Sequence, residues 1–239
     1  AATQRIPEGL LPLKPDFRAD ALAGKRIGVL RTYGGAGNVP AVEAAFTRAL
    51  ARLEAAGAVL IDPIESDTTG MGAAEYAVLL HEFRDDLNAY LEARLLIPDS
   101  LAELIAYNES NADTVMPHFG QESFLAAEAT GGRAAPEYAE ALARSKLISR
   151  GGLDGAFDAH ALDAIIAPSN GPAWPTDYKN GDGFSVGSSS LAAVSGYPSI
   201  TVPADTADGL PLGLSFVGRE WHDREIIEFA FAFERAGTD

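Results

Sequence analysis

The chain contains no cysteine among its 239 residues. This absence excludes disulfide bonds, thiolate nucleophiles and cysteine-ligated metal sites. It does not identify the redox compartment, because cysteine-free proteins occur on both sides of a membrane. The location therefore stays unknown from composition: the cytoplasm is favoured, and a periplasmic or secreted location would follow if a longer precursor carried a signal peptide.

Positive charge is scarce. The chain has 18 Lys and Arg against 34 Asp and Glu, a formal net charge of -16. Binding nucleic acid requires a basic face, and no local cluster of Lys and Arg provides one. We expect no nucleic-acid partner, and interpret the acidity as a well-solvated surface.

Long apolar runs are also missing. No run approaches the roughly 20 residues that a membrane helix needs, so no membrane partner is expected. The opening residues, AATQRIPEGLLPLKPDF, lack the basic and then apolar segments of a signal peptide. Apolar residues make up 47% of the chain and charged residues 22%, which is typical of a folded globular protein.

The first part of the chain alternates between strand and helix patterns. Residues 1–24 are proline-rich and aperiodic, which predicts a linker or arm, and residues 25–239 form the folded portion. A short β-branched run at 27–30 predicts a buried strand. A helix that begins at Pro40 and ends at Gly57 follows, and AVLIDPI predicts a second strand. Such a unit is expected to be parallel and right-handed.

Helical patterns fill the middle of the chain. Apolar residues between Tyr76 and Leu91 mark one long amphipathic helix, and Ser100 with Glu103 forms a capping-box pattern for the next. Pro136 begins another long helix, in which Gly151 and Gly152 predict a break.

The last part of the chain returns to strands in DAIIAP, SITVPA and GLSFVG, followed by a helix through Ile226 and Phe233. The polar loop ADTADGLPL predicts that the last two strands are antiparallel. The predicted fold class is therefore α/β, with a mixed β-sheet covered by helices.

Two patterns resemble a cofactor-binding motif and a metal-binding motif, but neither has the residues at the spacing that the motif requires. Gly34, Gly35 and Gly37 lie between a strand and a helix, but Pro40 stands where G-x-G-x-x-G has its third glycine, so a tight turn is predicted. His81-Glu82 begins like H-E-x-x-H, but Asp85 replaces the second histidine, and a surface or capping histidine is expected. We predict no cofactor and no metal.

The serines at 188–190, in VGSSSLAAVSGYP, are the most obvious candidate nucleophiles. A serine hydroxyl needs a base within hydrogen-bonding reach, and no G-x-S-x-G turn surrounds these residues. A polar turn that caps the following helix accounts for them without catalysis. The open alternative is a complete hydrolase in which one of these serines works with His160 and Asp163.

The segment SNGPAWPTDYKNGDGF, which follows DAIIAP, combines aromatic, amide and carboxylate side chains without periodicity. Loops at strand ends are where open α/β sheets bind ligands. The compatible alternative is a rigid cover that packs Trp174 into the core.

Four segments in order resemble the carboxyl-terminal part of amidase signature enzymes: AIIAPSNGPAWPTDYKNGDGF, SSLAAVSGYPSITVPA, GLPLGLSFVGREW and AFAFERA. GYPSITVP is similar to the family element G-x-P-x-x-x-x-P, and GLPLGLSFVG to its L-P-x-G strand. The resemblance covers roughly residues 20–236 and is most specific over 160–236. The G-P-A-W and N-G-D pieces look most like bacterial peptide-amidase-type members. The resemblance implies a partial amidase-signature fold.

The catalytic core of that family has no match in this chain. The resemblance implies a glycine- and serine-rich G-G-S-S-G-G core preceded by a lysine, in which a serine nucleophile, a second serine on a cis peptide and a neutral lysine relay the proton. Lys14, Lys25, Lys146 and Lys179 lie in other contexts. The resemblance therefore implies that this chain contains no catalytic residue. They would lie in a missing amino-terminal half of the same protein.

The resemblance implies a hydrolase that cleaves carboxamide C–N bonds, including the terminal amide of a peptide. This portion would supply scaffold and substrate-channel loops and be inactive alone. Loop placement suggests six substrate-binding candidates: Trp174, Asp177, Asp182, Phe184, Ser188 and Ser189. The family's substrate-binding carboxylate corresponds here to Val186, so it is not carried over.

The expected partners are an amide substrate, the missing half and, through an open sheet edge, a second copy of the chain. The alternative function is a non-catalytic module that binds a small polar ligand with the loops at 168–190.

Overall fold

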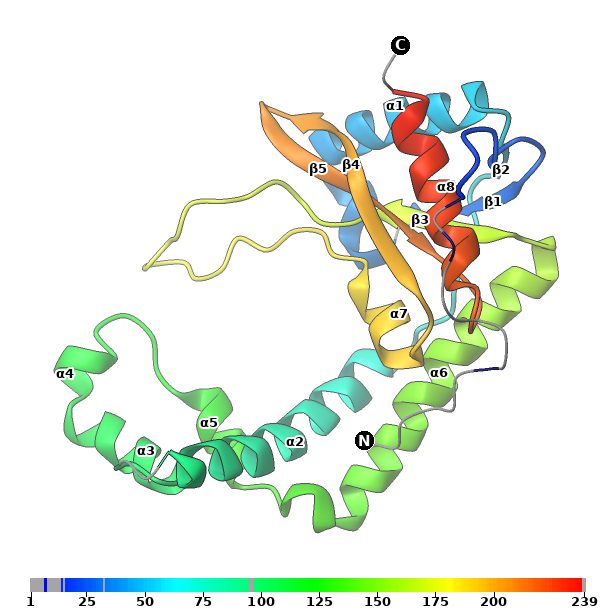
Figure 1. The fold of residues 1–239 in the computed structure, drawn as a ribbon. Helices are drawn as coiled ribbons and strands as arrows, with labels where there is room; N and C mark the ends of the chain where they lie inside the picture. Colours follow the sequence, from blue (N-terminus) through cyan, green and yellow to red (C-terminus); the bar gives the residue numbers. More distant parts are fainter. Residues whose placement is uncertain (1–6, 8–13, 15, 32, 95–96, 238–239) are drawn as a thin grey trace. The chain divides into compact units, whose positions relative to one another are not determined.

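The computed structural model describes residues 7, 14, 16–31, 33–94 and 97–237, which form an α/β fold (Figure 1). The chain divides into two compact units. The first contains the described residues of 1–67, 149–175 and 183–239, and the second contains those of 68–148 and 176–182. Most of the predicted arm at 1–24 lies outside the described residues.

The first unit contains a five-stranded mixed sheet with strand order β2-β1-β3-β5-β4. Its strands are β1 (Arg26–Val29), β2 (Val59–Ile61), β3 (Ala164–Pro168), β4 (Ser199–Ala207) and β5 (Leu210–Val217). β1 is parallel to β2 and to β3, and β5 is antiparallel to β3 and to β4. The predicted mixed sheet is confirmed.

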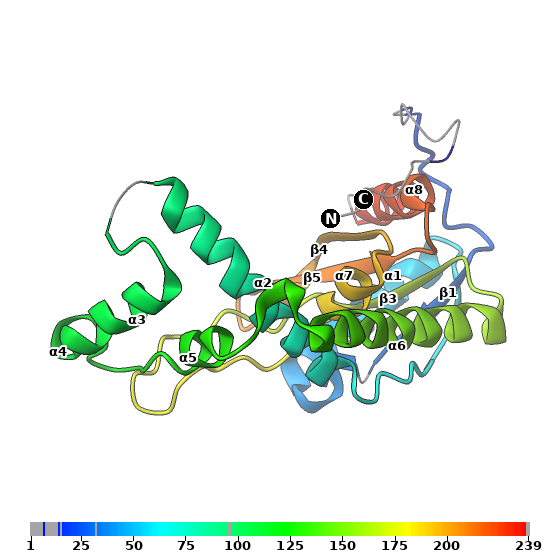
Figure 2. The ribbon, with the colours of Figure 1, turned by 90° about the horizontal axis from the view of Figure 1, so that it is seen from below.

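Helices α1 (Pro40–Ala55) and α8 (Asp223–Arg235) cover one face of the sheet. Pro40 begins α1 because its missing N–H would lack a helical partner there in any case, and Gly57 follows the helix at a φ of 87°. Phe46 and Leu53 from α1 join Phe216 of β5 and Phe233 of α8 in the principal core. α7 (Ser189–Ser195) and the carboxyl-terminal half of α6 (Pro136–His160) lie on the side of β4 and β5 opposite to α8 (Figure 2).

The described part of the predicted arm packs against α8. Phe17 lies 6.1 Å from Phe231, measured between ring centroids, and Arg18 donates to Glu228 at 3.0 and 3.2 Å. Leu22 is fully buried in the principal core.

The second unit is helical. Its elements are α2 (Met71–Ala93), α3 (Leu101–Ser110), α4 (Ala112–Val115), α5 (Glu122–Glu128), the short 3₁₀ helix η2 (Gly132–Ala134) and the first half of α6. Leu101, Ile105 and Ala127 form its buried centre, with Leu80 and Phe124 packed against them. The predicted cap of α3 is confirmed, because Ser100 Oγ accepts the N–H of Glu103 at 3.3 Å.

Two boundary predictions were wrong. α6 continues through Gly151 and Gly152, because a glycine costs only about 1 kcal/mol in a helix. Gly152 also leaves space for Ser66, whose Oγ would lie 2.6 Å from an added Cβ. The expected loop between β4 and β5 is only a two-residue turn. Asp208 and Gly209 both have positive φ, at 52° and 79°, as a tight hairpin requires.

No described helix is long and apolar enough to cross a membrane.

Candidate functional site

The loop that follows β3 is closed at its base by backbone pairing. Ser188 donates its N–H to the carbonyl oxygen of Ser169 at 3.1 Å, and Gly171 donates to that of Val186 at 3.1 Å. The Val186 side chain is fully buried in a small cluster with Val42 and Leu212. The two ends of the loop are therefore fixed to the folded core of the first unit.

The two aromatic candidates lie together near the base of this loop. The rings of Trp174 and Phe184 meet edge-on, with 6.1 Å between centroids and 80° between planes. They remain 41% and 58% exposed, so the alternative that Trp174 is packed in the core is wrong. A Cβ on Gly183 would lie 2.9 Å from the indole, so glycine at this position lets the ring lie against the backbone.

The two carboxylate candidates belong to the second unit, at residues 176–182. The Asp177 carboxylate accepts the N–H groups of Lys179 and Asn180 at 2.8 and 2.9 Å, and the side-chain amide of Asn180 at 2.7 Å. The N–H of Asn180 is the main reason that the pKa of Asp177 is lowered. Asp177 therefore holds its own turn, whereas Asp182 is exposed.

Ser188 does not cap α7 with its side chain, contrary to the prediction of a capping turn. Its Oγ donates to the carbonyl oxygen of Ser169 at 3.4 Å, and its backbone is not extended, with φ -118° and ψ 7°. Ser188 is 5% exposed, whereas Ser189 is exposed at the first position of α7.

The alternative triad is not assembled. Asp163 precedes β3, where its carboxylate accepts from Lys25 Nζ at 3.0 Å and from the Arg26 N–H at 2.8 Å. Ser188 is bonded to the residue that follows β3. At about 3.3 Å per residue, the five residues of β3 separate these two sites by roughly 16 Å or more.

Sequence reasoning missed a group of three hydroxyls at this end of the sheet. Ser169 Oγ lies 2.7 Å from Ser215 Oγ, which lies 2.9 Å from Thr201 Oγ1, and Ser169 donates to Thr201 at 3.3 Å. Gly213 leaves them room, since an added Cβ would lie 2.8 Å from Ser169 Oγ. Thr201 and Ser215 are a cross-strand pair, a signal visible only once the register is known.

The glycine segment packs against the base of the loop. It forms η1 (Tyr33–Asn38), in which 3₁₀ turns are interrupted by a kink at Gly34 and Gly35, whose φ of 65° and 88° are not helical. Gly187 donates its N–H to the carbonyl oxygen of Gly34 at 3.1 Å. The predicted tight turn is confirmed, and the close backbone approach explains the glycines.

His81 is buried rather than at the surface. It is 8% exposed, and its Nδ1 lies 2.8 Å from the carbonyl oxygen of Ala77 one turn earlier in α2. Among the described residues, no three His, Asp or Glu side chains converge in a way that could hold a metal ion.

Comparisons with known proteins match this fold and sequence. The Amidase family model matches residues 11–227. A probable amidase of Arabidopsis thaliana is 35% identical over 98% of this chain and 42% of its own length. A glutamyl-tRNA(Gln) amidotransferase component of Moorella thermoacetica is 29% identical over 97% of the chain and 47% of its own length.

Solved structures of peptide amidases are also similar to this chain in fold and sequence. The peptide amidase PAM in complex with the competitive inhibitor chymostatin has a TM-score of 0.82 and 40% identity over 91% of this chain and 44% of that one. Native peptide amidase from Stenotrophomonas maltophilia has a TM-score of 0.75 and 39% identity over the same shares. The chain spans about half the length of the curated relatives that it matches. By its sequence and by its mixed α/β sheet, the chain belongs to the Amidase family.

Proposed function

We propose that the chain is the carboxyl-terminal part of an amidase that hydrolyses carboxamides to a carboxylate and ammonia. The proposal depends mainly on one observation. The family match extends over residues 11–227 of this chain. The chain nevertheless spans only 42% of the length of one curated relative and 47% of the length of another. The 239 residues contain no G-G-S-S-G-G core. The serine nucleophile, the second serine and the lysine would therefore belong to the other half of the parent protein.

The hydroxyl geometry supports this assignment. Ser188 directs its proton to a backbone carbonyl, which cannot act as a general base. Ser169 and Ser215 bond to each other and to Thr201, and none of these groups can take a proton at neutral pH. In this proposal these residues shape the end of the sheet without acting as nucleophiles.

The substrate channel would be lined by the loop after β3. The exposed ring faces of Trp174 and Phe184 are suited to apolar parts of the substrate, and Ser188 and Ser189 lie where the same loop enters α7. Asp177 is occupied by its own turn, so Asp182 is the better candidate for a polar contact. The similarity to peptide amidases favours the terminal amide of a peptide as substrate.

Ammonia release from a peptide amide tests the proposal. We expect the 239-residue chain to be slower than the full-length parent by roughly 10⁶-fold, the factor lost when a hydrolase loses its nucleophile–base unit. Turnover by the chain that disappeared in the triple variant Ser188→Ala, Ser189→Ala, Ser190→Ala, but not in the control Ser110→Ala, would contradict it.

The open edge of the sheet is the proposed contact for a second copy when the other half is absent. β4 is an outer strand of nine residues, and unpaired edge groups readily pair with another chain. We expect concentration-dependent dimers in sedimentation velocity. A monomer at the highest attainable concentration would refute this contact.

A further inference from the structure

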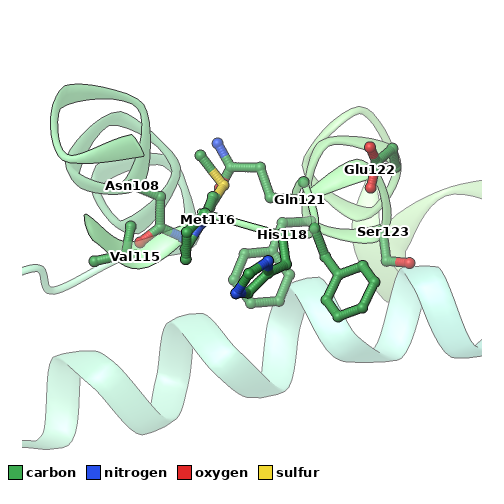
Figure 3. Close-up of a pocket in the computed structure, with 11 residues that line it drawn as sticks. Asn108, Val115, Met116, His118, Gln121, Glu122 and Ser123 are labelled. Atoms are coloured by element: carbon green, nitrogen blue, oxygen red, sulfur yellow. The ribbon is translucent and has the colours of Figure 1, made fainter. Parts of the chain in front are cut away.

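The second unit contains a pocket of about 440 Å³ that none of the predicted site residues lines. This volume lies within the range of roughly 300–1,000 Å³ that is typical of small-molecule sites. In Figure 3, Asn108 and Val115 lie on one side of the pocket and Glu122 and Ser123 on the other. Met116 and His118, from the loop that joins α4 to α5, lie between them.

Hydrogen bonds and ring contacts hold the walls in place. Asn108 donates its side-chain amide to Gln121 Oε1 at 3.1 Å, and Gln121 Nε2 donates to the carbonyl oxygen of Ile105 at 3.2 Å. Phe124 stacks on Phe83 of α2, with 5.5 Å between centroids. The pocket is therefore shaped by contacts that require no ligand.

Aromatic and apolar side chains are exposed around the pocket. His118 stacks on Tyr178, with centroids 4.1 Å apart and planes at 23°, and Phe119 lies 6.0 Å from Tyr178. Phe119 is 53% exposed and Val115 43% exposed. The faces of aromatic rings attract cations, with Tyr and Phe among the preferred partners.

The residues that line the pocket include one carboxylate and no Lys or Arg. Glu122 lines the pocket, and its carboxylate lies against Gly120, where only the absence of a Cβ leaves room for it. Between Arg94 and Arg133 the sequence contains no Lys or Arg. It contains six carboxylates there: Asp99, Glu103, Glu109, Asp113, Glu122 and Glu128. A negative potential over aromatic surface complements an organic cation.

We propose that this pocket binds a small organic cation, in which an ammonium, amidinium or guanidinium group is attached to a flat or aliphatic apolar body. The apolar body lies against Val115, Met116 and Phe119, and the cationic group lies towards Glu122. None of the residues that line the pocket belongs to the loop after β3, and the inference does not depend on the proposed amidase activity.

Calorimetric titration of the 239-residue chain with three molecules of similar shape tests the proposal. Benzamidinium carries the positive charge, benzamide is neutral and benzoate is negative. We expect benzamidinium to bind about tenfold or more tightly than benzamide, and benzoate to give no signal up to about 10 mM. Added salt is expected to weaken the binding of benzamidinium.

Matched variants locate the site. Glu122→Gln and Phe119→Ala should each weaken benzamidinium binding by about three- to tenfold. Glu92→Gln, which removes the same charge from an exposed position on α2 outside the pocket, should leave it unchanged. Far-ultraviolet circular dichroism of each variant verifies that the helices remain.

Equal binding of benzamidinium and benzamide would overturn the proposal, as would the absence of benzamidinium binding to the folded chain. Equal losses in Glu122→Gln and Glu92→Gln would also overturn it, because they would mean general attraction to an acidic protein.

Discussion

Substituting Gly34 by alanine tests the packing of the glycine segment against the base of the loop. Gly34 has a φ of 65°, and a Cβ at this position would overlap the carbonyl oxygen of Gly187. The obstacle is backbone, so it cannot be removed by a change of rotamer. Gly187 must move, and its hydrogen bond to the carbonyl oxygen of Gly34, 3.1 Å long, must lengthen or break.

The cost can be estimated from two contributions. Placing an alanine in the left-handed region costs about 1–2 kcal/mol. Losing one backbone hydrogen bond costs about 0.5–1.5 kcal/mol. Together they predict that Gly34→Ala lowers the free energy of unfolding by about 1.5–3.5 kcal/mol.

Gly209 provides the matched control. Its φ is 79°, but an added Cβ would meet nothing within 4 Å, so Gly209→Ala should cost only the conformational contribution of about 1–2 kcal/mol. Gly34→Ala is also expected to shift the fluorescence of the folded protein, since Trp174 lies on the displaced loop, whereas Gly209→Ala is not. Equal losses of stability in urea titrations of the two variants would refute the close approach.

Three further predictions concern the core and two titrating groups. Phe216→Ala should lower the free energy of unfolding by about 3–5 kcal/mol in urea titrations, because Phe216 is fully buried. Burial and a hydrogen bond to Asp154 raise the pKa of Tyr197 to about 12. Its contribution to stability should therefore be complete below about pH 10 and lost as the pH rises towards about 12, and should be absent in Tyr197→Phe. Because the N–H of Asn180 lowers the pKa of Asp177, NMR titration should place the midpoint of its protonation below that of an ordinary aspartate.

The strands of the sheet could be predicted because their signal is local. The run Ala164–Pro168 is buried at every position and reads as a continuous apolar segment, as expected for a central strand. The turn at Asp208 and Gly209 was missed, although Asp-Gly is a hairpin signal, because neighbouring polar residues suggested a longer loop. The helix break at Gly151 and Gly152 was wrong because packing outweighed low helix propensity.

The candidate site could be predicted only as a segment. Its mixture of aromatic and polar residues indicated a loop at the end of β3, but not that Asp177 stabilises its own turn or that Ser188 bonds to Ser169. The pocket beside α5 was not predicted. The aperiodic stretch Met-Pro-His-Phe-Gly-Gln at 116–121 met the same criterion as the loop after β3 and was the available signal.

The sequence by itself determined most of the strands and helices, the family, and the absence of a G-G-S-S-G-G segment from these 239 residues. Hydrophobic periodicity and short ordered motifs indicate these features, and both can be recognised without knowing which distant residues are in contact. The tertiary structure alone decided which groups meet. Ser169 lies beside Thr201 and Ser215, and Gly34 lies beside Gly187. Such partners are separated by tens to more than a hundred residues, and only the register of the sheet and the packing of the loops bring them together.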